Sequence, residues 1–129
     1  MLKNRSMPDS GVIPVLAYPD VNAAVDWLCR AFGFTVRLRI GNHRVQLNAG
    51  TGAVVVAQGP GRSAVMVRVA DVDAHYQRTL AAGIPVAGVP ATYPFGERQY
   101  SAEDLGHHVW TFSESVADVD PAEWGDVST

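Results

Sequence analysis

Aromatic side chains gather in the second half of the chain, where they could form a wall for a flat ligand. Trp110 and Phe112 are two residues apart, so they share one face of an extended strand. Tyr93, Phe95 and Tyr100 come from the segment that precedes it. A stacked aromatic ligand would gain about 0.5–1.5 kcal/mol per ring pair beyond its buried area. The same cluster also fits a core packed with aromatic rings and holding no ligand.

Arginine and amide side chains form a second candidate set in the first half. Arg37 and Arg39 are expected to share one face of a strand, and the next strand places Gln46 between Arg44 and Asn48 on one face. An arginine on an inward sheet face would bind an anionic or amide-rich ligand in fork geometry. Surface arginines held in salt bridges are the alternative. Arg68 interrupts an apolar run, on the opposite side of its strand from Val65, Val67 and Val69.

Histidine and glutamate side chains are the candidates for proton transfer. His107 and His108 are adjacent, so in a strand they would point to opposite faces and could not bind one metal together. With His43 at a hairpin and His75 on an outer helical face, we expect surface or turn histidines. A metal or proton-transfer site centred on His108 is the alternative. Either of two glutamates could act as a lone base, namely Glu97 and Glu103.

Composition excludes several classes of function. The chain has 129 residues and a formal net charge of −3, with no basic stripe for nucleic acid. Cys29 is the single cysteine, which leaves neither an internal disulfide nor a cysteine-rich zinc site. The polar start lacks the apolar run of a signal peptide, and no stretch approaches the ~20 apolar residues that span a bilayer. We therefore expect a cytoplasmic protein that contacts neither nucleic acid nor membrane.

Two helices are predicted to carry the rest of the architecture. The first follows the capping residue Asp20 and ends at Gly33, with an apolar stripe of Val21, Ala24, Val25, Leu28 and Phe32. The second follows Asp71 and stops at Gly83, with Val72, Tyr76, Thr79 and Leu80 on one face. The two capping segments and the two closing segments match at a separation of roughly fifty residues, which indicates a paired duplication.

Strand-like segments surround each helix in the same order. The segments expected as strands are 12–18, 36–40, 43–48 and 53–57 in the first half, and 64–69, 85–89, 98–102 and 108–113 in the second. The prediction is thus a single α+β domain of two tandem βαβββ modules, about 12–58 and 64–113, joined by a linker at 59–63. An acidic C-terminal tail, 114–129, is predicted to hold one helical turn that begins at Asp120 and carries Trp124.

The doubled pattern resembles the glyoxalase / bleomycin-resistance / extradiol-dioxygenase group, also called the vicinal oxygen chelate superfamily. The resemblance covers roughly residues 12–113. It lies in the order and spacing of several short sequence motifs rather than in any one motif. These motifs are Leu16-Ala17-Tyr18-Pro19-Asp20, Ala31-Phe32-Gly33-Phe34, Val69-Ala70-Asp71-Val72-Asp73, Ala81-Ala82-Gly83, Pro94-Phe95-Gly96-Glu97-Arg98 and Asp104-Leu105-Gly106-His107-His108-Val109-Trp110-Thr111-Phe112.

The resemblance implies curled half-barrel sheets with outer helices, a ligand cavity on the concave side and a homodimer. Enzymes of this group typically hold a divalent metal through His, Gln or Glu on the first and last strand of each module. Counting from the duplicated caps places Ile13, Val55, Ala64 and Trp110 at these positions. None of these side chains can coordinate such a metal, so the prediction is a metal-independent member without a cofactor.

The sequence therefore predicts a bleomycin-resistance-like protein that sequesters a small, partly aromatic molecule, such as an antibiotic or secondary metabolite, and breaks no bond. The alternative is a lyase, isomerase or dioxygenase of the same group, with a displaced metal or none. A scaffold with a filled cavity is a third interpretation. No catalytic residue is assigned, and the ligand-binding residues are predicted to be Trp110, Phe112, Tyr93, Phe95, Arg98, Tyr100, Gln46 and Met66.

Overall fold

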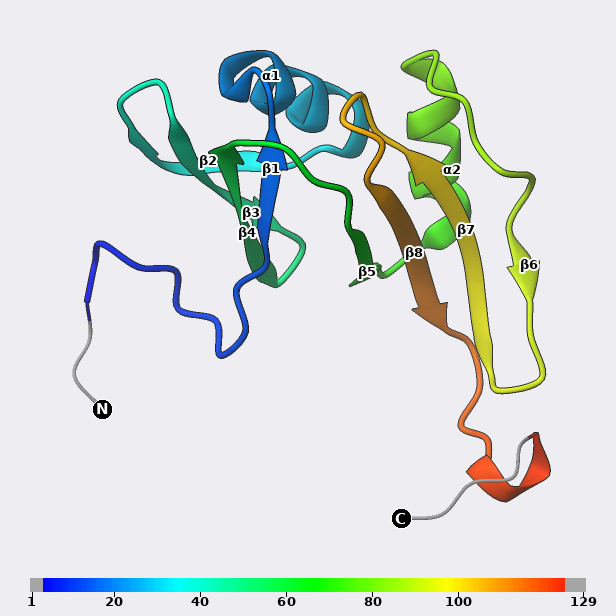
Figure 1. Ribbon diagram of the computed structural model, residues 1–129. Helices are drawn as coiled ribbons and strands as arrows, with labels where there is room; N and C mark the ends of the chain where they lie inside the picture. Colours follow the sequence, from blue (N-terminus) through cyan, green and yellow to red (C-terminus); the bar gives the residue numbers. More distant parts are fainter. Residues whose placement is uncertain (1–3, 125–129) are drawn as a thin grey trace.

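Two modules with the same order of elements make up the chain (Figure 1). A computed structural model describes residues 4–124. Module one comprises β1 (Val15–Tyr18), α1 (Val21–Phe32), β2 (Thr35–Ile40), β3 (Arg44–Ala49) and β4 (Gly52–Gln58). Module two comprises β5 (Ala64–Arg68), α2 (Val72–Ala81), β6 (Ala91–Thr92), β7 (Glu97–Glu103) and β8 (Val109–Ser115). The sheet orders, β1-β4-β3-β2 and β5-β8-β7-β6, are identical, which confirms the α+β fold and its duplication.

Both helices begin at the capping residues expected from the sequence. The side chain of Asp20 accepts a hydrogen bond from the Ala23 amide at 3.0 Å, and Asp71 does the same for Ala74 at 3.0 Å. Gly33 ends α1 in the left-handed conformation, at φ 77°, where a glycine has no Cβ to strain. Among the described residues, no helix is long and apolar enough to cross a membrane.

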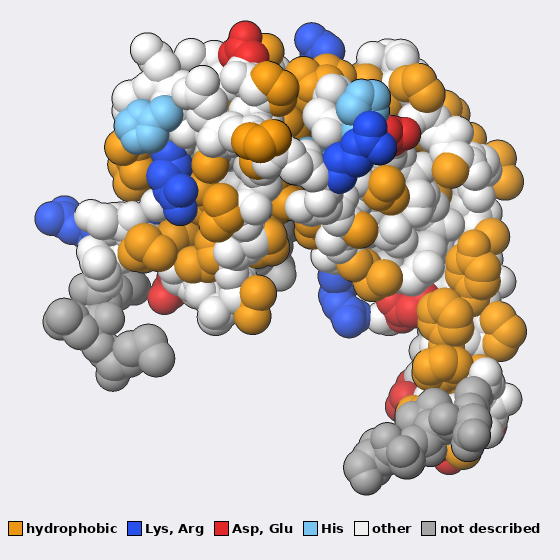
Figure 2. Space-filling model, viewed as in Figure 1, with side chains coloured by type: hydrophobic (Ala, Val, Ile, Leu, Met, Phe, Trp, Pro, Cys, Tyr) orange, Lys and Arg blue, Asp and Glu red, His pale blue; other side chains and the backbone are white. Residues whose placement is uncertain are grey.

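Each sheet has a helix-facing side and an opposite side, which we call the inner face. On β8 the rings of Trp110 and Phe112 point toward the helices and pack against Phe32 of α1, at centroid distances of 5.7 and 4.9 Å. Val109 and Thr111 alternate with them and so lie on the inner face. Figure 2 shows that the molecule is an arch, hollowed on one side between its two lobes.

One continuous core joins the modules. Phe32 and Phe34 of module one lie in the same buried cluster as Tyr100, Trp110 and Phe112 of module two. The tightest polar link between the modules is Asp104, which is 4% exposed and accepts a hydrogen bond from the Tyr18 hydroxyl at 2.5 Å. The modules therefore share one interior instead of folding around two.

The strand expected at 85–89 does not form in the structure. Only Val86 pairs there, in an isolated bridge with Ala102, and the strand itself forms later, at β6. Pro85 lacks an amide donor, and Gly88 adopts φ 125°, a conformation that interrupts an extended run. The edge of sheet two is consequently short.

The helical turn predicted in the tail is present as a 3₁₀ helix at Pro121–Glu123. The side chain of Asp120 accepts from the Ala122 amide at 3.1 Å, as expected for the cap. Trp124 then packs on Phe95, with ring centroids 5.3 Å apart. Residues 125–129 of the predicted tail, and residues 1–3, lie outside the described part of the chain.

Candidate functional site

The aromatic residues expected at a cavity wall lie instead in the core. Trp110 and Phe112 are fully buried, and Tyr100 is 3% exposed. The Tyr100 hydroxyl bonds to Thr79 of α2 at 2.8 Å, and its ring stacks on Phe112. Burial raises the pKa of Tyr100 to about 12. These rings hold the helices onto the sheet and do not face open space.

The remaining predicted ligand residues are dispersed. Tyr93 is 43% exposed and stacks on Phe95 at the far end of β6 and β7. Arg98 lies on the helix side and forms an ion pair with Asp73 at 2.9 Å. Gln46 lies on the inner face of module one, while Met66 is 65% exposed on the inner face of module two. The structure therefore does not bring these eight residues together in one place.

A bulge in β2 changes the faces assigned to its arginines. The register with β3 shifts between Val36 and Leu38, so Arg37 and Arg39 do not share a face. Arg37 reaches Gln46 on the inner face, whereas Arg39 bonds to Asn22 of α1 at 2.6 Å. The expectation that both arginines point the same way is wrong, because a bulge inverts the alternation and the residue types carry no sign of it.

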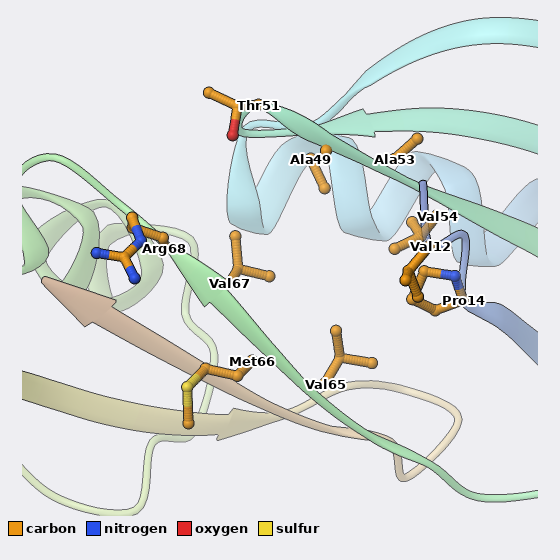
Figure 3. A pocket seen from close by; sticks show the side chains of 11 residues that line it. Val12, Pro14, Ala49, Thr51, Ala53, Val54, Val65, Met66, Val67 and Arg68 are labelled. Atoms are coloured by element: carbon orange, nitrogen blue, oxygen red, sulfur yellow. The ribbon is translucent and has the colours of Figure 1, made fainter. Parts of the chain in front are cut away.

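One hollow in the described part of the chain lies between the two modules. It measures about 290 Å³ and is lined by β5, by β4 with its preceding turn, and by residues just ahead of β1. Figure 3 shows Val65 and Val67 pointing from β5 to one side and Met66 to the other. Apolar side chains predominate, and Thr51 and Arg68 supply the polar groups. An apolar groove with few polar groups is the usual form of a small-molecule site, and this volume is at the small end of the range.

A row of hydrogen-bonded polar side chains continues from this groove across the inner face of module two. The Arg68 guanidinium donates to the Ser115 hydroxyl at 2.6 Å, and the Ser113 hydroxyl donates to Glu97 at 2.6 Å. Ser101 and Thr111 bond to each other at 2.8 Å, and the Gln99 amide donates to Ser113 at 3.1 Å. This row was not among the residues predicted from the sequence, although its alternation with Tyr100, Trp110 and Phe112 is a signal that could have found it.

The carboxylate of Glu97 is held in its charged form. Hydrogen bonds from Ser113 and Ser115 lower its pKa below the usual value, and the nearby Arg68 adds to the effect. The inner face of module two thus presents the charged groups of Glu97 and Arg68 beside neutral donors and acceptors. Such a surface suits a ligand with both polar and apolar parts.

The inner-face positions of the first and last strands do not fit a divalent metal. Residue register places Val15 opposite Val55 and Met66 opposite Thr111. Ala64 is also an inner-face residue, Ile13 precedes β1, and Trp110 faces the helices. Hydrocarbon, thioether and hydroxyl groups lack the nitrogen and carboxylate ligands such ions need. Within residues 4–124, no group of three or more His, Cys, Asp or Glu is arranged to hold a metal.

Two histidines are more buried than expected. His108 is fully buried beside Tyr18, donates from Nε2 to the Ala17 carbonyl at 2.7 Å, and leaves Nδ1 without a partner among the described residues. His75 is half-buried, packs on Phe112 at 4.0 Å, and bonds through Nδ1 to the Tyr100 hydroxyl. The outer-face position expected for His75 is wrong because α2 turns this residue toward β7 and β8.

Acid should destabilise the protein through His75. Burial lowers the pKa of His75, so the folded state resists the proton that the unfolded chain binds below about pH 6.5. Its stabilising contribution is present above that pH and is lost as the pH falls toward the folded pKa. We expect the free energy of unfolding to fall by up to about 1.4 kcal/mol per pH unit there. Urea titrations of His75→Gln at several pH values should show a shallower dependence of the free energy of unfolding on pH. The exposed-site variant His107→Gln should keep the pH dependence of the native protein.

Comparisons with known proteins agree with the geometry. The sequence profile of the Glyoxalase/Bleomycin resistance protein/Dioxygenase superfamily matches residues 13–112. The chain is similar to the crystal structure of TioX from Micromonospora sp. ML1, with 37% identity, a TM-score of 0.76, and coverage of 82% of this chain and 98% of that one. No curated protein matches the chain.

Two more distant structures share the fold alone. One is a bleomycin resistance determinant encoded on the transposon Tn5, at 16% identity, TM-score 0.72, covering 84% of this chain and 99% of that one. The other is a lactoylglutathione lyase from Agrobacterium tumefaciens, at 18% identity, TM-score 0.69, covering 83% and 94%. The same architecture thus occurs in a protein named for resistance and in one named for catalysis, so the fold does not choose between them.

Proposed function

The chain belongs to the glyoxalase/bleomycin resistance protein/dioxygenase superfamily. From this premise we propose that it sequesters a small, partly aromatic molecule, such as an antibiotic or secondary metabolite, without a metal. The observation that carries the proposal is the chemistry of the inner faces. Where the superfamily's metal ligands are expected, this chain has alkyl, thioether and hydroxyl groups. Protection would follow from mass action in the cytoplasm, and no bond would be broken.

The groove between the modules is the proposed ligand site. Its apolar lining from Val12, Val54 and Val65 would cover a flat ring, while Arg68 would bind a carbonyl or an anionic group at the rim. The open arch also supports a homodimer, because a second copy placed against the hollow side would enclose a ligand that one copy leaves partly exposed.

A panel of flat aromatic compounds in a thermal-shift assay tests the proposal. We expect at least one compound to raise the melting temperature of the native chain. Arg68→Ala should raise the Kd of that compound about tenfold, because one charge-assisted hydrogen bond is lost. Arg98→Ala is the matched control, since Arg98 is engaged with Asp73 on the helix side. A panel without any shift, or stoichiometric zinc, nickel, manganese or iron in the purified protein, would contradict the proposal.

An enzyme of the same superfamily is the second candidate, and Glu97 is the observation that favours it. Its charged carboxylate lies on the inner face, oriented by the Ser113 hydroxyl. A positioned carboxylate can accept a proton from a bound substrate. Glu97→Gln separates the two functions, because it would abolish turnover by an enzyme and leave sequestration of a neutral aromatic ligand nearly unchanged.

A further inference from the structure

Residues 4–8 of the chain lie across the inner face of module one. The Arg37 guanidinium donates from Nη2 to the Arg5 carbonyl at 3.1 Å. The Gln46 amide donates from Nε2 to the next carbonyl, that of Ser6, at 2.9 Å. Figure 1 shows this segment running below sheet one before the chain turns upward into β1. The face therefore recognises two consecutive peptide carbonyls.

The two donors are bonded to each other as well as to the segment. Arg37 also donates from Nη1 to Oε1 of Gln46 at 2.5 Å, which fixes the amide so that its Nε2 points outward. Gln46 comes from the middle of β3 and is 2% exposed, and Arg37 projects from the β2 bulge. A guanidinium that spans a glutamine and a ligand carbonyl uses the fork geometry that a lysine cannot reproduce.

Few interactions fix the segment on this face. Its other hydrogen bonds are internal, from the Ser6 amide to Asn4 Oδ1 at 3.0 Å and from the Met7 amide to the Asn4 carbonyl at 3.2 Å. Residues 4–7 are exposed, and Pro8 alone in the segment is buried. Exposed backbone with few buried contacts opens easily, so a competing ligand could replace it.

We propose that the inner face of module one binds a peptide-like ligand with two consecutive amide carbonyls, and that residues 4–8 occupy this site until the ligand displaces them. This inference rests on the proposed function, of which it names the ligand class. Arg37 and Gln46 recognise the ligand's backbone, and its aromatic part lies in the groove between the modules. The site is closed in the absence of ligand because the chain supplies its own carbonyls.

Cleavage by trypsin after Arg5 reports whether the segment is docked. The probe is an acetylated, amidated peptide that copies residues 4–8 with norleucine in place of Arg5, which trypsin does not cut. We expect the probe to accelerate the cut at Arg5 in the full-length protein, because local opening exposes the backbone to protease. Cleavage at the exposed Arg62 of the linker is the internal control and should not change.

Two variants and one matched control connect the effect to the two donors. Gln46→Glu keeps the shape and the bond to Arg37 but turns an oxygen toward the Ser6 carbonyl, so cleavage at Arg5 should rise about fivefold without probe, as loss of one neutral hydrogen bond implies. Arg37→Lys should act alike. Asn48→Asp is the matched control, because Asn48 shares this face and donates to Thr35 instead.

Each outcome decides the proposal. Equal cleavage at Arg5 in the native chain and in Gln46→Glu would mean that the segment is not held, and would overturn it. A faster cut in Gln46→Glu with no response to the probe would overturn the ligand class. Protection that grows with protein concentration would assign the site to the segment of a second copy instead. An aromatic compound that binds in the thermal-shift assay without speeding the cut at Arg5 leaves the proposed function intact and refutes this inference alone.

Discussion

Replacing Asp104 by alanine should lower the free energy of unfolding by about 3–5 kcal/mol, because buried donors would be left without their acceptor. Oδ2 accepts from the Tyr18 hydroxyl at 2.5 Å and from Trp110 Nε1 at 2.9 Å. Oδ1 accepts from the backbone amides of Gly106 and His108, at 2.9 and 3.0 Å. Urea unfolding followed by far-UV circular dichroism measures the change.

The size of this effect follows from where Asp104 is placed. Tyr18 belongs to β1 and Trp110 to β8, so one carboxylate joins the first strand of module one to the last strand of module two. Burial and the bond to Asp104 raise the pKa of Tyr18 well above its usual range, so its hydroxyl stays a donor. A loop aspartate thus holds the two modules in register.

Two neighbouring variants control for this interpretation. Asp104→Asn keeps the shape but turns an NH₂ group toward two donors, so it should fall between the native protein and alanine. Glu103→Gln alters an exposed hydrogen bond to His107 and should cost less than about 0.5 kcal/mol. A loss under 1 kcal/mol for Asp104→Ala would show that water replaces the carboxylate and would refute the assigned role.

Truncating Phe112 to alanine should also destabilise the fold strongly, by about 3–5 kcal/mol. Its ring is fully buried and contacts Phe32, His75 and Tyr100, with centroids 4.9, 4.0 and 5.3 Å away. Thermal and urea denaturation would measure the loss. Removing the ring leaves a cavity that three elements surround and cannot easily collapse into.

The matched variant is Thr111→Ala, one residue away on the opposite face of β8. Among residues 4–124 its hydroxyl bonds only to Ser101, on the inner face, and truncation should cost about 1 kcal/mol or less. If Thr111→Ala were the more damaging of the two, the assignment of the faces would be inverted. Ligand binding should instead be more sensitive to Thr111→Ala, because Thr111 pairs with Met66, which lines the proposed site.

The architecture was predictable from the sequence because its signals are local. The caps at Asp20 and Asp71 and the glycine after α1 fix the helix ends with hydrogen bonds between near neighbours. The duplicated sequence motifs then indicate that the strands follow the same order in each half. The prediction failed at 85–89, where Gly88 and Pro85 outweigh an apolar composition that suits a strand.

The candidate site was less predictable because it depends on strand phase and register. Assigning Trp110 to an inner-face position required a count from Gly106, and an error of one residue exchanges the two faces. The amphipathic alternation pointed the other way, since the larger apolar residues belong against the helices. The docking of residues 4–8 on Gln46 involves a contact across 40 residues, which no local pattern encodes.

The identical strand orders of the two sheets have a consequence for how the chain folds as it is made. Every strand of sheet one precedes Pro60, so this sheet can assemble while module two is still being synthesised. Its first strand, however, pairs with its last and must wait for Val55, whereas the β3–β4 hairpin closes early. Even then the hydroxyl of Tyr18 has no acceptor until Asp104 emerges. Module one therefore lacks one of its stabilising hydrogen bonds while it is synthesised. The nascent chain reaches its final stability only when the last quarter of the sequence has been added.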